Sequence, residues 1–95
     1  MTYSLEFDPR ALKEWRKLGD TIRQQLKKKL LERLENPHIP ADKLRGFNNL
    51  YKIKLKSAGY RLVYEVKDTE ITVLVLSVGK RERLQVYQNA QSRIQ

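Results

Sequence analysis

The middle of the chain alternates apolar and cationic residues with a period of two. The apolar residues of the first run are Tyr51, Ile53 and Leu55, and they alternate with Lys52, Lys54 and Lys56. This pattern is typical of a strand with one apolar and one cationic face. Residues 57–59 are small and end in Gly59, which tolerates a positive φ, and residues 60–66 are β-branched and aromatic. The stretch predicts a β-hairpin.

The register of this hairpin decides which side chains share a face. If residues 56–59 form the loop, Lys54 faces Arg61 and Lys52 faces Val63. The cations Lys52, Lys54 and Arg61 then lie on one face, opposite the face of the apolar side chains. Like charges placed opposite each other destabilise a hairpin. Because the chain keeps three of them together, we expect this face to meet a polyanion; a slip of one residue would undo the arrangement.

The segments before the hairpin predict a strand and two helices. Residues 2–7 alternate as a short strand with one buried face, and Asp8 followed by Pro9 is a typical start of a helix. Gly19 ends that helix, and Asp20 or Thr21 caps the next. The apolar positions of the second helix are Ile22, Leu26, Leu30, Leu31 and Leu34, and its other face carries Arg23, Lys27, Lys28, Lys29 and Arg33. That basic face is a solvated surface or an RNA-binding one.

Residues 37–49 form a loop whose histidine, His38, is interpreted as incidental to function. After the hairpin, residues 71–78 are nearly all apolar, which predicts a strand in the middle of the sheet, buried on both faces. A last short helix is expected over residues 83–94, with Leu84, Tyr87 and Ala90 or Gln91 along one side. The order β-α-α-β-β-β-α predicts an α+β fold: an antiparallel-rich four-stranded sheet packed by an N-terminal helical hairpin, with a short C-terminal helix.

Composition adds a strong electrostatic signal to this fold. The 95 residues form one small domain (1–95) with 20 Lys+Arg against 11 Asp+Glu, a net charge of +9. Nucleic acid is the expected partner, although an anionic membrane surface or an acidic protein also fits. The chain has no cysteine, which excludes disulfides, thiolate zinc sites and a cysteine nucleophile. It has no leader-like N-terminus and no apolar run long enough to span a membrane, so we expect a cytoplasmic protein.

The residue inventory restricts the possible catalysis to Lys, Arg and Tyr. With one histidine, no acidic cluster that suggests a metal pair and no glycine-rich phosphate loop, the chain offers no common nuclease or nucleotide site. An RNA phosphodiester is still a feasible substrate. A lysine among other cations loses its proton more easily and can act as a base. Arginine matches the phosphoryl oxygens.

Several other residues are candidates for the same surface. Tyr87 is placed to stack on a base or orient a hydroxyl, or else it packs the last helix. Glu65 is expected to form an ion pair rather than act as a base. Further RNA-binding positions are Lys43, Arg45, Lys56, Lys80 and Arg83, close to the hairpin or at the end of the strand that follows it.

Over essentially its whole length the chain resembles the RelE toxins of bacterial toxin–antitoxin modules. The segments that carry the resemblance are residues 11–18 (ALKEWRKL), 43–46 (KLRG), 51–55 (YKIKL), 59–64 (GYRLVY) and 77–83 (SVGKRER), together with Tyr87. The middle segments recur across the wider RelE/ParE superfamily and indicate only the fold. The full basic set with the C-terminal tyrosine indicates the RelE branch.

The resemblance implies an endoribonuclease that enters the ribosomal A site and cuts mRNA there without metal or other cofactor. The implied products are a 2′,3′-cyclic phosphate and a 5′-hydroxyl. It implies that Lys52 and Lys54 bind phosphate or act as base, and that Arg61 stabilises the transition state. Arg81 is the implied proton donor, although arginine is a poor acid, and Tyr87 contacts the cleaved nucleotide.

The same resemblance implies several partners. These are a RelB-like antitoxin that displaces the C-terminal helix, the 70S ribosome with mRNA and 16S rRNA in its A site, and operator DNA bound only through the antitoxin, with which the toxin acts as a corepressor. Two other functions fit the fold: a ParE-like inhibitor of DNA gyrase, and a plain RNA-binding module. An interferase needs Lys54, Arg61, Arg81 and Tyr87 together, whereas a gyrase inhibitor needs none of them as a set.

Overall fold

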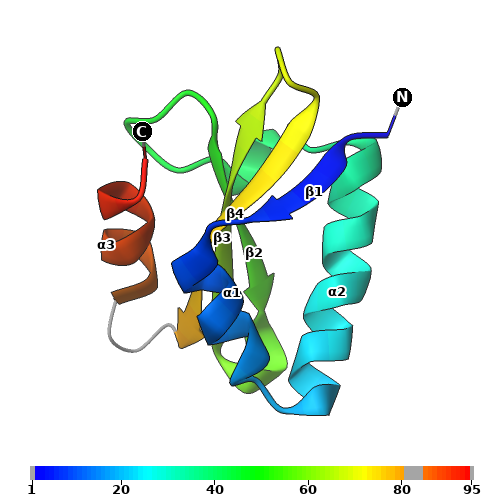
Figure 1. Cartoon of the computed structure of the whole chain (residues 1–95), viewed down its shortest axis with the longest axis vertical. Helices are drawn as coiled ribbons and strands as arrows, with labels where there is room; N and C mark the ends of the chain where they lie inside the picture. The colour runs from blue at the N-terminus through cyan, green and yellow to red at the C-terminus, as the bar shows by residue number, and fades with distance from the viewer. Residues whose placement is uncertain (1, 81–84, 95) are drawn as a thin grey trace.

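The protein has the element order that the sequence predicts. The computed structural model describes residues 2–80 and 85–94 (Figure 1). The strands are β1 (Ser4–Phe7), β2 (Leu50–Leu55), β3 (Tyr60–Lys67) and β4 (Thr72–Lys80), and the α-helices are α1 (Pro9–Arg16), α2 (Asp20–Glu35) and α3 (Gln85–Ser92). Two short 3-10 turns, η1 (Pro40–Asp42) and η2 (Lys56–Ala58), precede and follow β2.

The four strands form one mixed sheet in the order β1-β4-β3-β2. The pairs β2–β3 and β3–β4 are antiparallel, and β1 lies parallel to β4. The long apolar strand β4 is therefore an inner strand, as its composition predicts. The α+β prediction is confirmed in both element order and antiparallel content.

The predicted register of the hairpin is confirmed. Lys54 pairs with Arg61 and Lys52 pairs with Val63. The loop is the turn η2 closed by Gly59, whose φ of +69° is in the left-handed region that glycine adopts at low cost. A bulge between Val63 and Tyr64 shifts the register of β3 against β4.

Helices cover both faces of the sheet (Figure 1). The larger core lies under α1 and α2, where Leu26 and Leu30 pack with the β2 and β3 side chains Ile53 and Leu62. The smaller core lies under α3, and consists of Leu50, Val63, Leu76, Val86 and Ala90. Because Leu50 and Val63 lie on the face that carries Lys52, Lys54 and Arg61, the cationic face is partly covered by α3.

Several local predictions were wrong. Gly19 is the N-cap of α2 and makes no side-chain capping bond, so neither Asp20 nor Thr21 is the cap. Leu31 is 51% exposed, because it lies beside rather than on the buried stripe of α2. Ile71 precedes β4 in a turn with φ of +51°. The Asp8 cap is confirmed, since its carboxylate accepts a hydrogen bond from the Arg10 amide.

The buried stripe of the last helix also differs from the prediction. Val86 and Ala90, four residues apart, face the sheet, while Gln91 is exposed. Leu84 lies outside the described residues. None of the helices in residues 2–80 and 85–94 is long and apolar enough to cross a bilayer.

Candidate active site

Three of the predicted catalytic residues meet on the β2–β3 hairpin. Arg61 on β3 lies between Lys54 on β2 and Gly79 on β4 in the sheet register. Lys52 and Lys54 are partly buried on the same face. The alternation of β2 places both ammonium groups on this side, because residues two apart on a strand share a face. Glycine at position 79 leaves no side chain on the β4 side of Arg61.

Arg61 is more deeply buried than a surface cation, with 6% of it exposed. One of its N–H groups donates to the carbonyl oxygen of Tyr60 at 2.9 Å. No carboxylate within residues 2–80 and 85–94 forms an ion pair with it, whereas the arginines that do have such a partner are Arg10, Arg23, Arg33 and Arg93. A buried cation without a counter-charge is costly unless an anion binds it. The arrangement therefore favours an anionic ligand at Arg61.

The cations of the hairpin act on one another. The charge of Lys52 lowers the pKa of Lys54 below the ordinary lysine value, and partial desolvation and the charges of Arg61 and Lys56 act in the same direction. Asp42 opposes them and raises the pKa of Lys54. The net effect makes Lys54 easier to deprotonate than an isolated lysine, as a general base requires.

Helix α3 brings Tyr87 to this face of the sheet. Tyr87 is partly buried against the smaller core, beside the fully packed Val86 and Ala90. The hydroxyl of Ser77 on β4 donates to the carbonyl oxygen of Val86 at 2.5 Å and joins the start of α3 to the sheet. The packing interpretation of Tyr87 is therefore confirmed in part, because its ring packs against this core, and its role toward a nucleotide stays a prediction.

The predicted RNA-binding lysines do not all share this face. Lys80 pairs with Tyr60, and its Nζ lies 5.9 Å from the centroid of the Tyr60 ring. Tyr60 packs against the larger core, so Lys80 lies on the face opposite Arg61. Lys43 and Arg45 are exposed on the loop that runs along the outer edge of β2, and Lys56 is exposed in η2. Arg81 and Arg83 lie outside the described residues.

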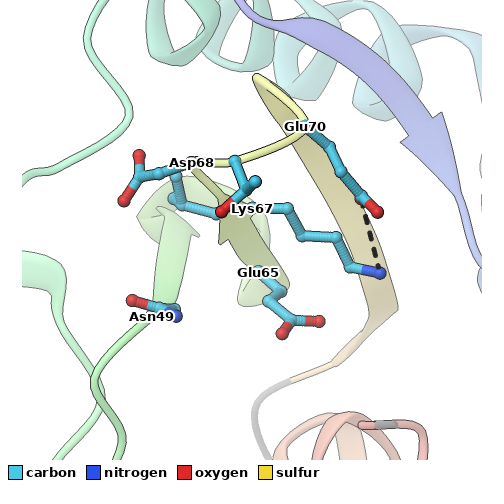
Figure 2. A pocket seen from close by; sticks show the side chains of 7 residues that line it. Asn49, Glu65, Lys67, Asp68 and Glu70 are labelled. Atoms are coloured by element: carbon cyan, nitrogen blue, oxygen red, sulfur yellow. Dashed lines mark ion pairs between the residues drawn. The ribbon is translucent and has the colours of Figure 1, made fainter.

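The ion pair predicted for Glu65 is absent among the described residues. Lys67 pairs instead with Glu70, with 3.9 Å between Nζ and Oε2. Figure 2 shows Glu65, Asp68 and Glu70 around one pocket with Asn49, at the end of the β3–β4 hairpin. Leu50, the register partner of Glu65, is the β2 residue farthest from the Lys54 end of the strand. Acidic side chains thus gather away from the cationic end of the sheet.

The sequence prediction placed Arg33, which lies beside the site, on the wrong face of its helix. Arg33 was predicted on the outer face of α2, but only 16% of its side chain is exposed. Its guanidinium donates to the Lys52 carbonyl oxygen at 3.3 Å, to the Tyr64 hydroxyl at 2.9 Å and to Asp42 at 2.5 Å. The sequence contained a signal for this position, since Arg33 lies three residues after Leu30 on the buried side.

His38 also has more contacts than the sequence indicates. Its Nδ1 lies 3.0 Å from the Tyr51 hydroxyl, and its Nε2 lies 2.8 Å from Asp68 Oδ1. The Tyr3 hydroxyl donates to the same Asp68 oxygen at 2.7 Å. These contacts tie the loop before β2 to the sheet, which is a structural role.

Comparison with known proteins agrees with this geometry. A family model described as the ParE toxin of the type II toxin–antitoxin system parDE matches residues 5–85. The mRNA interferase toxin RelE of Escherichia coli K12 is 65% identical over 94 residues, which cover 99% of each chain. The chain belongs to the RelE toxins of this family.

Solved structures extend the similarity to the whole RelE fold. An E. coli RelE mutant in the free state superposes with a TM-score of 0.94 at 62% identity, with all of both chains covered. RelE in the intact E. coli RelBE toxin–antitoxin complex superposes with a TM-score of 0.82 at 67% identity, over 85% of this chain and 99% of that one. This RelE-family chain therefore has the fold of these E. coli RelE structures.

Proposed function

We propose that the protein is the toxin of a type II toxin–antitoxin system and that it cleaves mRNA in the A site of the ribosome. The observation that carries the proposal is Arg61, a buried cation beside Lys54 that has no carboxylate partner among the described residues. The E. coli relative named mRNA interferase, at 65% identity over nearly the full length, supports the same activity. On this proposal residues 1–95 form a single toxin domain that acts in the cytoplasm, where ribosomes are found.

The proposed reaction is an in-line attack within the RNA. Lys54, as its free amine, takes the proton of a 2′-hydroxyl, and the 2′-oxygen bonds to the adjacent phosphorus. The bond from phosphorus to the 5′-oxygen breaks, and that oxygen takes a proton. The products are a 2′,3′-cyclic phosphate and a 5′-hydroxyl, and neither metal nor cofactor takes part.

Each residue of the site has a distinct proposed role. Arg61 stabilises the charge that develops on the phosphoryl oxygens, which is the task that a guanidinium fork performs well. Lys52 binds phosphate, and its effect on the pKa of Lys54 supports Lys54 rather than Lys52 as the base. Tyr87 stacks on or orients the cleaved nucleotide. Arg81 is the proposed proton donor and awaits direct test.

The proposed partners follow from the family. A RelB-like antitoxin would bind the toxin and displace α3, which removes Tyr87 from the site; the E. coli RelBE complex supports such a partner. The toxin with its antitoxin would act as a corepressor on operator DNA, which only the antitoxin contacts. The net charge of +9 suits entry into the ribosome beside 16S rRNA, and Lys43, Arg45, Lys56, Lys80 and Arg83 are the proposed RNA contacts.

The experiment that tests this function is primer extension on an mRNA in stalled ribosomes, with purified protein added. Wild-type protein should cut within the A-site codon, and Arg61→Ala should lose at least about a hundredfold in rate. Because Arg61 is buried, Arg61→Lys serves as a second variant that keeps the charge, and circular dichroism checks the fold of both. Undiminished cutting by a folded Arg61→Ala protein would contradict the catalytic role of Arg61.

The same assay separates the alternatives. Efficient cutting of naked RNA would show that the ribosome does not position the substrate. Growth arrest with no mRNA cleavage, together with inhibition of DNA gyrase, would identify a ParE-like inhibitor, the alternative function on this fold.

A further inference from the structure

A small pocket lies beside Lys54, between α2, η1 and β2. Its volume is about 270 Å³. The side chains that line it are Lys29, Glu32 and Arg33 from α2, Asp42 from η1, and Ile53, Lys54 and Lys56 from β2 and η2. The pocket therefore holds the proposed general base together with two carboxylates. A carboxylate paired with Lys54 would stabilise its ammonium form and oppose its use as a base.

Asp42 is held by Arg33. Their ion pair has 2.5 Å between Nη2 and Oδ2, and the two side chains are 16% and 23% exposed. The guanidinium is itself fixed by the Tyr64 hydroxyl and by the Lys52 carbonyl oxygen. The Tyr64 hydroxyl in turn donates to the carbonyl oxygen of Pro37 at 2.7 Å. Arg33 thus has little freedom to release the carboxylate.

We propose that Arg33 is a positioning residue that holds the Asp42 carboxylate away from Lys54 and so keeps Lys54 free to act on the RNA. This inference rests on the proposed function, because it assigns Lys54 a role in cleavage. Arg33 itself touches no reacting atom. It acts through Asp42.

The charged groups around Lys54 act on its pKa in opposite directions. Lys52, Arg61 and Lys56 lower the pKa of Lys54, and Asp42 raises it. Lys29 and Glu32 of α2 line the same pocket, and neither is changed in the variants of Arg33 and Asp42. If Arg33 is removed, Asp42 keeps its negative charge but loses its arginine, so its attraction for the Lys54 ammonium grows.

A purely structural brace would behave differently. Arg33 joins α2 to β2, β3 and η1, so its removal also destabilises the fold. Loss of a brace lowers stability but does not change the titration of Lys54. Neutralising Asp42 in the Arg33 variant does not restore the lost contacts of Arg33. It does remove the negative charge that Arg33 holds in wild type.

The test is an NMR titration of the Lys54 side chain in the free full-length protein, followed through its Cε and Nζ signals and assigned with Lys54→Arg. Lys54 should titrate at higher pH in Arg33→Met than in wild type, and return to or below the wild-type value in Arg33→Met/Asp42→Asn. Arg10→Met removes another arginine–aspartate pair, at the start of α1 and outside this pocket, and should change nothing.

Cleavage in stalled ribosomes gives the second readout. Arg33→Met should cut roughly threefold to tenfold more slowly near neutral pH, with the rising limb of the pH profile moved upward, and the double variant should recover the rate. If Arg33→Met fails to fold, Arg33→Lys is the second variant, because it keeps the positive charge but loses the guanidinium that binds Asp42, Tyr64 and the Lys52 carbonyl oxygen. Lys54 should still titrate at higher pH in this variant than in wild type, and an unchanged titration would contradict the role of Arg33.

The two proposals fail in different ways. An unchanged Lys54 titration in Arg33→Met, or a change that Asp42→Asn does not reverse, overturns the role of Arg33. The predicted titration shifts without mRNA cleavage by wild-type protein would uphold Arg33 as the residue that holds Asp42 and overturn the proposed function.

Discussion

Glu14 on α1 binds Arg93 at the end of α3, although 79 residues separate them in the chain. Arg93 donates to both carboxylate oxygens, at 2.9 and 3.2 Å, and to the carbonyl oxygen of Leu76 at 2.7 Å. Glu14 also accepts a hydrogen bond from the Val78 amide at 3.1 Å. The pair therefore joins both helices to β4, and it anchors the helix that carries Tyr87.

Breaking this pair should loosen α3. Arg93→Met removes the guanidinium from the Glu14 carboxylate, which keeps only its amide donors, and from the Leu76 carbonyl oxygen. The variant should lose about 2 kcal/mol in the free energy of unfolding, measured in urea. Amide hydrogen exchange in α3 should accelerate more than exchange in α2. In a cycle with Glu14→Gln, the double variant should lose less than the sum of the single losses. Strictly additive losses would show that the two side chains are not coupled.

Replacing Lys52 should distinguish the base from its neighbour. Because the charge of Lys52 is the largest cause of the lowered pKa of Lys54, Lys52→Gln should move the rising limb of the cleavage profile to higher pH. The rate near neutral pH should fall roughly threefold to tenfold at saturating ribosomes, and recover in alkaline buffer. The cleavage rate of Lys54→Gln should not recover at any pH. If alkaline buffer restored the cleavage rate of Lys54→Gln but not that of Lys52→Gln, Lys52 would be the base.

The contacts of Asp68 predict an acid-dependent contribution to stability. The hydrogen bond from Tyr3 is the largest cause that lowers the pKa of Asp68 below its ordinary 3.8, and the contact with His38 adds to it. A carboxyl with a lowered pKa in the folded state stabilises the fold above its ordinary pKa and loses that effect as pH falls through the lowered value.

Tyr3→Phe tests this relationship. The pKa of Asp68, followed by NMR of its carboxyl carbon, should rise toward the ordinary value in the variant. This hydrogen bond should make wild type more stable than the variant at neutral pH, as measured by the free energy of unfolding. In acid, where Asp68 is protonated, that difference should vanish. An unchanged Asp68 titration would show that the Tyr3 bond does not persist in solution.

Gly59 should be needed for the hairpin that carries the site. No atom lies within 4 Å of a Cβ placed there, so the cost of a side chain comes from the backbone φ of +69° alone. Gly59→Ala should destabilise the fold by about 1 kcal/mol in urea unfolding. Gly59→Asn should lose less, because asparagine tolerates this conformation better. Equal losses for both variants would contradict the left-handed φ as the source of the cost.

Much of the fold could be predicted from patterns within short segments of the sequence. Alternation gave the two faces of β2, and the turn with Gly59 set the register that pairs Lys54 with Arg61. The apolar run of β4 indicated an inner strand, because only a strand covered on both sides needs no polar face. These inferences succeeded because period and turn chemistry act between residues close in the chain.

The tertiary structure decided what covers each face. Periodicity says which side of an element a residue faces, but it does not say which other element packs there. Arg33 points inward because its partners on η1, β2 and β3 are distant in the chain, and the burial of Arg61 is likewise set by the folded structure. Lys80 lies on the opposite face because its orientation depends on pairing with Tyr60 beyond a bulge. The sequence by itself determined the cationic hairpin, and the long-range packing decided which of its charges have partners.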